Sequence, residues 1–263
     1  MFKLVVHILL FIILTIITQV GGIIYILSTL FFNRQSSTRI KQLVLFITSY
    51  LIITFIAIPN IAPLMGRQKI ENSKFVTNHN FLTLLCNRNY VTPELNNTIK
   101  KTGWELGKKY SGIQLVYLDA NFPFLNGFPL LPHLSHNDGK KIDLSFIYKT
   151  KSGSLSNEKP SHSGYGIFES PKKHESNTSL LCKKKGYWQY DFTKYLTLGS
   201  TDNLFFALKE NRILLSILSK QKSVSKIFIE PHLKSRLQLN STKIRFHGCK
   251  AVRHDDHIHL QIK

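Results

Sequence analysis

Two long apolar runs near the N-terminus constrain this chain more than any other feature. The first run covers residues 4–32 and the second covers 43–64, and neither contains Asp, Glu, Lys or Arg. A helix needs roughly 20 apolar residues to cross a bilayer. Pro59 and Pro63, near the end of the second run, are typical of a helix that breaks at the membrane surface. We therefore predict two transmembrane helices, over about 4–32 and 43–64, in a membrane anchor at 1–65.

A cleaved signal peptide is the alternative interpretation of the first run. Its apolar stretch is about twice the usual core of 7–15 residues and no small-residue cleavage site precedes Arg34, so we expect an anchor that is retained. Arg34, Arg39 and Lys41 between the runs favour a cytoplasmic hairpin, whereas Lys3 and Arg67 would lie on the opposite side. Charge therefore leaves the membrane orientation open.

The composition turns polar and basic after the second run, which predicts a linker at 66–75 and one domain at 76–263. Helical and strand patterns mix there without regular alternation, so we predict the α+β class, with a small central antiparallel sheet and flanking helices. The expected helices cover 92–107, a segment through Ser219 that Thr201 or Asp202 caps, and a short segment from Pro231. The expected strands cover 114–118, 142–148, 226–229 and 257–262. The polar stretch 149–185 is expected to be a loop, either mobile or acting as a flap.

Charge and cysteine content restrict the partners and the compartment. The formal net charge of +20 predicts an anionic neighbour such as lipid head groups or acidic wall polymers. Nucleic acid is not expected as a partner, because a chain with two membrane spans has no obvious access to it. Cys86, Cys182 and Cys249 include no C-x-x-C pair, so no cysteine zinc knuckle is expected. One disulfide can form outside the cytoplasm, and the sequence leaves its pairing open.

Two histidine-containing clusters in the domain carry the candidate chemistry: SHNDGKKIDL at 135–144 and HDDHIH at 254–259. A catalytic zinc ion takes three nitrogen or oxygen ligands from the protein and keeps one position open. His136, Asp143 and His259 supply such a set. His257 lies on the same face of the final strand as His259, because side chains alternate along a strand. We therefore predict a zinc cleft in which His257 is the general base for the attacking water.

The neighbouring residues receive supporting roles. His254 is a candidate to stabilise the oxyanion or assist proton transfer, and Asp255 and Asp256 are candidates to orient the imidazoles. The first cluster alone would usually be structural, and the second alone could be a metal-scavenging tail, but the alternation of HIHLQI argues against a tail. Cys249 is interpreted as a buried or disulfide-bonded residue in preference to a thiolate ligand. The remaining histidines, His247 among them, lack partners at metal-ligand spacing and are expected to be surface or capping groups.

The two clusters carry a resemblance to a known family. SHNDGKKIDL resembles the S-H-x-x-G-x-x-x-D-L motif of the superfamily of lysostaphin-type enzymes, D-Ala-D-Ala metallopeptidases and Hedgehog domains. HDDHIH, with HLSH at 133–136, is similar to the zinc-site motifs of penicillin-insensitive murein endopeptidases. The similarity covers roughly 115–263. It implies that His136, Asp143 and His259 are the ligands and that His254 and His257 are active-site histidines. It also implies that His133 contacts a second metal or lies beside the first.

The sequence thus predicts a zinc-dependent peptidoglycan peptidase, an endopeptidase or a carboxypeptidase, that hydrolyses stem or cross-bridge peptides on the outer side of a bacterial cell membrane. Membrane lipid is expected to contact the chain through the two apolar helices. Two alternatives stay open: a binding module that keeps zinc without catalysis, and a D-Ala-D-Ala dipeptidase or carboxypeptidase. The last would need a cation for the substrate carboxylate, for which Arg253 or Arg245 is a candidate.

Overall fold

A computed structural model describes residues 2–31, 38–201 and 203–263 of the chain. Helices and sheets mix along the chain, as the α+β prediction states. The chain divides into two compact units, the first formed by 1–70, 81–93 and 120–139 and the second by 71–80, 94–119 and 140–263. The units part inside the predicted linker at 66–75, but two later segments belong to the first unit. The division into anchor, linker and domain stays a prediction.

The first unit contains mainly helices: α1 (Phe2–Thr18), α2 (Gly21–Leu30), α3 (Thr38–Ile52), the π-helical turn η1 (Ile53–Ala57), α4 (Ile58–Ile61), the 3-10 helix η2 (Ala62–Met65) and α5 (Phe81–Leu85). The short strands β1 (Gln68–Lys69) and β3 (Tyr90–Val91) pair antiparallel. Ile58, Ala62 and Tyr90 form a small buried core, and the Tyr50 hydroxyl donates a hydrogen bond to the Leu85 carbonyl. The later segments are thereby bound to the N-terminal helices.

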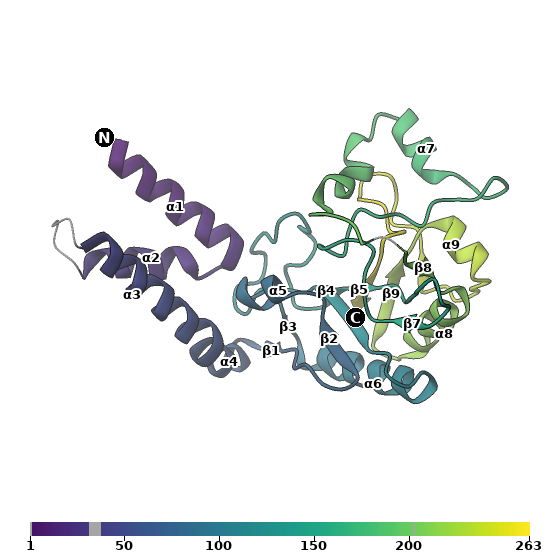
Figure 1. The fold of residues 1–263 in the computed structure, drawn as a ribbon, viewed down its shortest axis with the longest axis horizontal. Coiled ribbons are helices and arrows are strands. Elements are labelled where there is room, and N and C mark those ends of the chain that lie inside the picture. The colour runs from purple at the N-terminus through teal and green to yellow at the C-terminus, as the bar shows by residue number, and fades with distance from the viewer. Residues whose placement is uncertain (1, 32–37, 202) are drawn as a thin grey trace. The chain divides into compact units, whose positions relative to one another are not determined.

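The first apolar run is not one continuous helix, which differs from our prediction. It forms α1 of 17 residues and α2 of 10 residues, both shorter than a membrane span (Figure 1). Gln19 has a positive φ of 69°, and the Thr18 hydroxyl accepts a hydrogen bond from the Gly21 N–H. A Cβ at Gly22 would lie 2.0 Å from the Thr15 hydroxyl oxygen, so glycine is needed where α2 folds back against α1.

The second run forms one continuous helical segment, from Arg39 to Met65, that is long and apolar enough to cross a membrane by length and composition. It is the single helix of that kind among residues 2–31, 38–201 and 203–263, so two transmembrane helices are not seen. The segment passes through η1 and ends at Gly66, which has a φ of 71°. Phe32, the last residue of the first run, and Arg34, used in the orientation argument, lie outside the described residues.

A six-stranded sheet forms the centre of the second unit. Its strand order is β10 (Ile244–Arg245), β9 (Val224–Phe228), β11 (His257–Ile262), β5 (Lys141–Ser145), β4 (Leu115–Asp119) and β2 (Val76–Asn78). The four inner strands are antiparallel, as predicted, but both edge strands join in parallel, so the sheet is mixed. β11 lies between β5 and β9, which buries five of its six residues.

Helices and a smaller sheet complete the second unit. The helices are α6 (Pro93–Lys109), α7 (Thr178–Lys184), the 3-10 helix η3 (Trp188–Leu196), α8 (Leu208–Lys220) and α9 (Pro231–Arg236), and the smaller sheet has the order β7 (Leu155–Ser156), β6 (Tyr148–Lys149) and β8 (Phe205–Phe206). α8 contacts β9, and α7 lies at the end of this unit opposite α6 (Figure 1). The stretch 149–185, expected to be a loop, therefore includes the last residue of β6, the strand β7 and all of α7.

Candidate metal centre

The centre of the candidate site is the pairing of β5 with β11. In this antiparallel register Asp143 lies directly opposite His259, and both side chains are buried. His259 Nδ1 lies 2.9 Å from Asp143 Oδ1. Two ligands of one tetrahedral zinc ion would be separated by about 3.3 Å, given metal–ligand distances of about 2.0–2.1 Å. At 2.9 Å the two atoms are at hydrogen-bond distance, somewhat closer than two ligands of one zinc ion would be, so the contact places His259 beside Asp143 without identifying it as a ligand.

His133, His136 and Asp143 form a group that could hold a metal ion. Each offers one ligand atom, and these atoms all lie within 4.8 Å of one another. His136 Nδ1 lies 2.8 Å from the Ala120 carbonyl oxygen. A carbonyl accepts a hydrogen bond, so the proton belongs on Nδ1 and the lone pair on Nε2, the form in which imidazole binds a metal. The donor set of imidazoles and a carboxylate suits zinc and other divalent ions alike.

This group includes two of the three predicted ligands, His136 and Asp143, together with His133, which was expected to contact a second metal or to lie beside the first. The predicted ligand His259 contacts Asp143 as described above. Its role as a ligand stays a prediction.

His257 lies between two carboxylates, and the closer one is at hydrogen-bond distance from its Nδ1. Its Nδ1 lies 2.6 Å from Asp256 Oδ1 and its Nε2 lies 3.7 Å from Asp143 Oδ1. The Tyr165 ring meets the imidazole edge-on, and its hydroxyl donates a 3.0 Å hydrogen bond to Asp143 Oδ2. Burial lowers the pKa of His257, but the charges of Asp143 and Asp256 outweigh burial and raise the pKa to about 9. Asp256 thus has the contact expected of a residue that orients His257.

His254 lies beside His257 in a different electrostatic environment. The two ring centroids are 4.9 Å apart, and the His254 N–H donates a hydrogen bond to Glu230 Oε1. Burial, followed by the nearby histidines, lowers the pKa of His254 well below its ordinary value. His254 is therefore neutral at physiological pH and can accept or donate a hydrogen bond.

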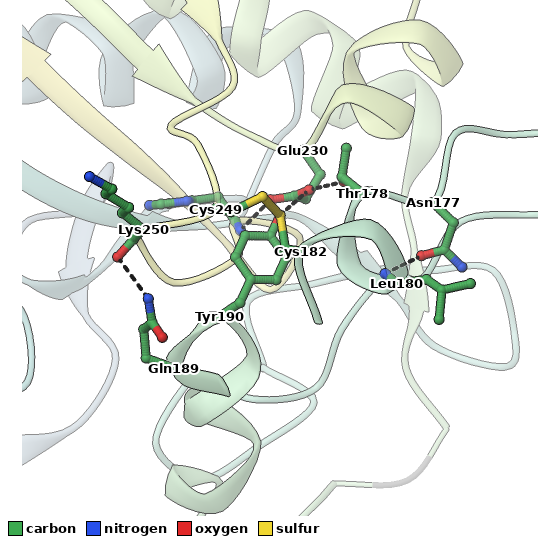
Figure 2. The surroundings of a disulfide bond; sticks show 10 residues. Asn177, Thr178, Leu180, Cys182, Gln189, Tyr190, Glu230, Cys249 and Lys250 are labelled. Carbon is green, nitrogen blue, oxygen red and sulfur yellow. Dashed lines mark hydrogen bonds between the residues drawn. A yellow bond between two sulfur atoms is a disulfide. The ribbon is translucent and has the colours of Figure 1, made fainter. Parts of the chain in front are cut away.

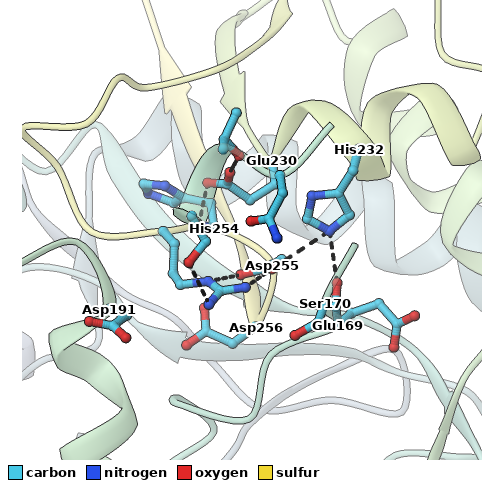
Figure 3. A network of polar contacts seen from close by, with 12 residues as sticks. Glu169, Ser170, Asp191, Glu230, His232, His254, Asp255 and Asp256 are labelled. Carbon is cyan, nitrogen blue, oxygen red and sulfur yellow. Dashed lines mark hydrogen bonds and ion pairs between the residues drawn. The ribbon is translucent and has the colours of Figure 1, made fainter. Parts of the chain in front are cut away.

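Asp255 makes different contacts from Asp256. It pairs with the Arg253 guanidinium, and its Oδ2 lies 3.6 Å from His232 Nε2 (Figure 3). The guanidinium also lies 3.8 Å from the Phe168 ring centroid. Arg253 was a candidate cation for a substrate carboxylate, and in this structure it is buried and bound to Asp255. The other candidate, Arg245, is exposed on β10 and donates from Nε to the Thr242 carbonyl.

A disulfide joins Cys182 of α7 to Cys249, which settles the pairing that the sequence left open (Figure 2). Cys249 is therefore no thiolate ligand, in agreement with the preferred prediction. Glu230 accepts hydrogen bonds from the Thr178 and Tyr190 hydroxyls as well as from the His254 backbone. The helical segment 178–196 is thus tied to the stretch that carries Cys249 and His254.

Sequence reasoning missed two neighbours of the site, His247 and Tyr165. The His247 ring stacks on Phe228 at 4.1 Å and lies 5.3 Å from the His254 ring, although it was expected to be a surface or capping group. Tyr165 belongs to the stretch expected to be a loop. The Tyr165 hydroxyl bonds to Asp143 and the His247 ring stacks on Phe228, both distant in sequence, so the tertiary structure brings these rings to the site.

Comparison with known protein families finds no match for this chain, and no curated protein matches it. The arguments for function therefore rest on the residues and their geometry.

Proposed function

We propose that this protein is a zinc-dependent peptidase that hydrolyses stem or cross-bridge peptides of peptidoglycan. The observation that supports the proposal is the group of His133, His136 and Asp143, which could hold a metal ion, with His257 and His259 of β11 beside Asp143. In the proposal His136, Asp143 and His259 hold the ion and His133 lies beside it. The resemblance of the two sequence clusters to murein endopeptidases supplies the substrate class.

A bound zinc ion would polarise the scissile carbonyl and make water a stronger nucleophile at neutral pH. A cation held by Asp143 would offset the charge that raises the pKa of His257 to about 9, so that His257 could act as a base at neutral pH. Asp256 holds the Nδ1 proton, so Nε2 is the atom that would then take the proton from the attacking water. His254 is neutral and lies next to His257, where it can donate a hydrogen bond to the developing oxyanion. Tyr165 fixes the orientation of Asp143 through its hydroxyl.

We also propose that the protein is attached to a bacterial membrane and that its catalytic residues lie on the outer side. The helical segment from Arg39 to Met65 supports attachment. The Cys182–Cys249 disulfide supports an oxidising compartment, because thiols in the cytoplasm are kept reduced. The net charge of +20 suits an anionic wall or membrane surface.

Digestion of purified peptidoglycan by the full chain in detergent, with products identified by mass spectrometry, tests the proposal. We expect cleavage that disappears after chelation and in His257→Ala, and that persists in His174→Ala, a matched change at an exposed histidine. The cleaved bond would distinguish an endopeptidase from a carboxypeptidase. Intact peptides, despite stoichiometric zinc, would contradict a peptidase and indicate a binding module.

A further inference from the structure

The segment 178–198 has an outer surface that the proposed catalysis does not use. Five large apolar side chains there are exposed: Leu180, Leu181, Trp188, Tyr195 and Leu198. Trp188 is 73 % exposed and Tyr195 is 71 % exposed. Both rings contact Phe192, at 6.1 Å between centroids in each case, and η3 contacts α7. We call this surface the aromatic platform.

The aromatic platform is a fixed surface, because the inner side of the same segment is anchored. Tyr190 is fully buried and donates a 2.6 Å hydrogen bond to Glu230. Cys182 is bonded to Cys249, and the Asn177 side chain caps the N-terminus of α7 by accepting from the Leu180 N–H (Figure 2). The segment therefore holds its apolar side chains in solvent while its polar contacts face the protein.

The charge around the aromatic platform is positive. Residues 178–198 contain four lysines and one aspartate, which gives a net charge of 4 − 1 = +3. Asp191 lies within salt-bridge distance of Lys183 and Lys194, at 2.5 and 3.2 Å. Lys184 and Lys185 are exposed at the end of α7, next to Trp188 in the sequence. A ligand for this surface would combine apolar material with negative charge.

We propose that the aromatic platform docks on the surface of an anionic lipid bilayer. Trp and Tyr favour the membrane–water interface, leucines enter the acyl region, and lysines pair with anionic head groups. A glycan strand would account for the aromatic rings but not for Leu180, Leu181 and Leu198, so lipid is the better fit. The proposal does not depend on peptidase activity.

Fluorescence quenching by brominated lipids tests this docking. The chain has two tryptophans, so Trp104→Phe leaves Trp188 as the reporter, and Trp188→Phe leaves Trp104 as a matched control. Trp104 lies on α6, is 45 % exposed and has Lys108 Nζ 3.7 Å above its ring. The full chain would be placed in vesicles of phosphatidylcholine alone or of equal parts phosphatidylcholine and phosphatidylglycerol.

We expect Trp188, but not Trp104, to be quenched in the vesicles that contain phosphatidylglycerol, and the quenching to weaken at high salt. Changing Lys184 and Lys185 to Gln should lower the ratio of docked to undocked protein by about 30-fold, from the usual contribution of a lysine near an anionic surface. Unquenched Trp188 in vesicles that carry the protein would overturn the proposal, as would equal quenching in both vesicles. A response of Trp188 to soluble glycan strands without quenching by lipid would also overturn it and would indicate sugar recognition.

Discussion

Asp143 is the residue on which the candidate site depends most, because three side chains approach its two carboxylate oxygens. His259 and His257 lie 2.9 and 3.7 Å from Oδ1, and the Tyr165 hydroxyl donates to Oδ2. Asp143 is completely buried, so its charge must be balanced by these neighbours or by a cation. The residue is therefore a strong candidate for a metal ligand and a poor candidate for a surface group.

Zinc titration of single variants should identify the third ligand. We expect His136→Ala, Asp143→Ala and His259→Ala to weaken zinc binding by more than about 100-fold, because removing a residue that only supports a ligand already costs about 10–100-fold. His133→Ala should cost less. Isothermal titration calorimetry measures each affinity, with His174→Ala as the control. A larger loss in His133→Ala than in His259→Ala would replace our ligand set with His133, His136 and Asp143.

The hydrogen bond between Asp256 and His257 leads us to predict a change in kcat when Asp256 is replaced. Asp256→Asn should lower kcat by about 10–100-fold with zinc content unchanged, since the amide orients the imidazole less well. Asp191→Asn, a buried carboxylate bound by lysines, is the matched control. Steady-state kinetics and metal analysis on the same samples check this. Normal kcat in Asp256→Asn would show that this contact is structural only.

The sequence allowed the histidines on the last strand to be predicted, but not all of the side chains that surround them. The alternation of HIHLQI predicts β11 with its correct bounds and places His257 and His259 on one face. His247 and Tyr165 could not be found in this way, because Phe228, on which His247 stacks, and Asp143, to which Tyr165 donates, are distant from them in sequence.

At the scale of elements, the predictions succeeded where local signals were complete. Pro93 at the first turn and Lys108 and Lys109 in the last turn delimit α6 two residues beyond the predicted end. The helix through Ser219 begins later than predicted, at Leu208, because Phe205 and Phe206 pair with β6 as strand β8. Asp202, its expected cap, lies outside the described residues. The predicted strand 142–148 ends at Ser145, because Tyr148 and Lys149 form β6 in the other sheet.

The contact of α9 with the stretch 169–175 should make stability depend on pH. Arg236 donates a 2.8 Å hydrogen bond to Glu175, and this contact lowers the pKa of Glu175 from 4.5 to about 2. A carboxylate with a lowered pKa stabilises the folded state above its ordinary pKa, and the contribution is lost as pH falls from 4.5 towards 2. Glu175→Gln should therefore lower the free energy of unfolding by about 1 kcal/mol at neutral pH. The loss should be smaller as the pH approaches the lowered pKa of Glu175, about 2.

Thermal unfolding of the wild type and of Glu175→Gln over this pH range measures the difference. Glu158→Gln, at an exposed position, is the control. A difference that stays constant with pH would contradict the ion pair as its source.

At the scale of the whole molecule, the Cys182–Cys249 disulfide reduces the number of conformations open to the unfolded chain. The two cysteines are 67 residues apart, and closing a loop of that length stabilises a protein by about 4 kcal/mol in the chain-entropy account. The pairing could not be predicted, because three cysteines allow several pairs and only the fold brings these two Cα atoms to 5.2 Å. Among the described residues, Cys86 is the cysteine that is not part of this disulfide.

We expect Cys182→Ser and Cys249→Ser to lower the free energy of unfolding by about 4 kcal/mol each, and the double variant to lose no more than either one. Denaturant titration with and without reductant measures this. Cys86→Ser is the matched control and should change stability little. The double variant keeps only Cys86, so a reductant effect that persists in it would contradict the Cys182–Cys249 disulfide as the source of the effect.

The position of β11 between two strands has a consequence for how this chain can change over time. The turn 150–154 contributes no residue to the candidate site, whereas β11 is fixed by pairs with β5 and β9 on both sides. One residue inserted before His257 that shifted this register would turn Ile258 and Leu260 towards Asp143 and bury hydrocarbon where imidazoles now stand. The candidate site therefore depends on alternate residues of one strand, His257 and His259. An insertion or deletion that shifts the register of β11 would disrupt it as much as the loss of either histidine.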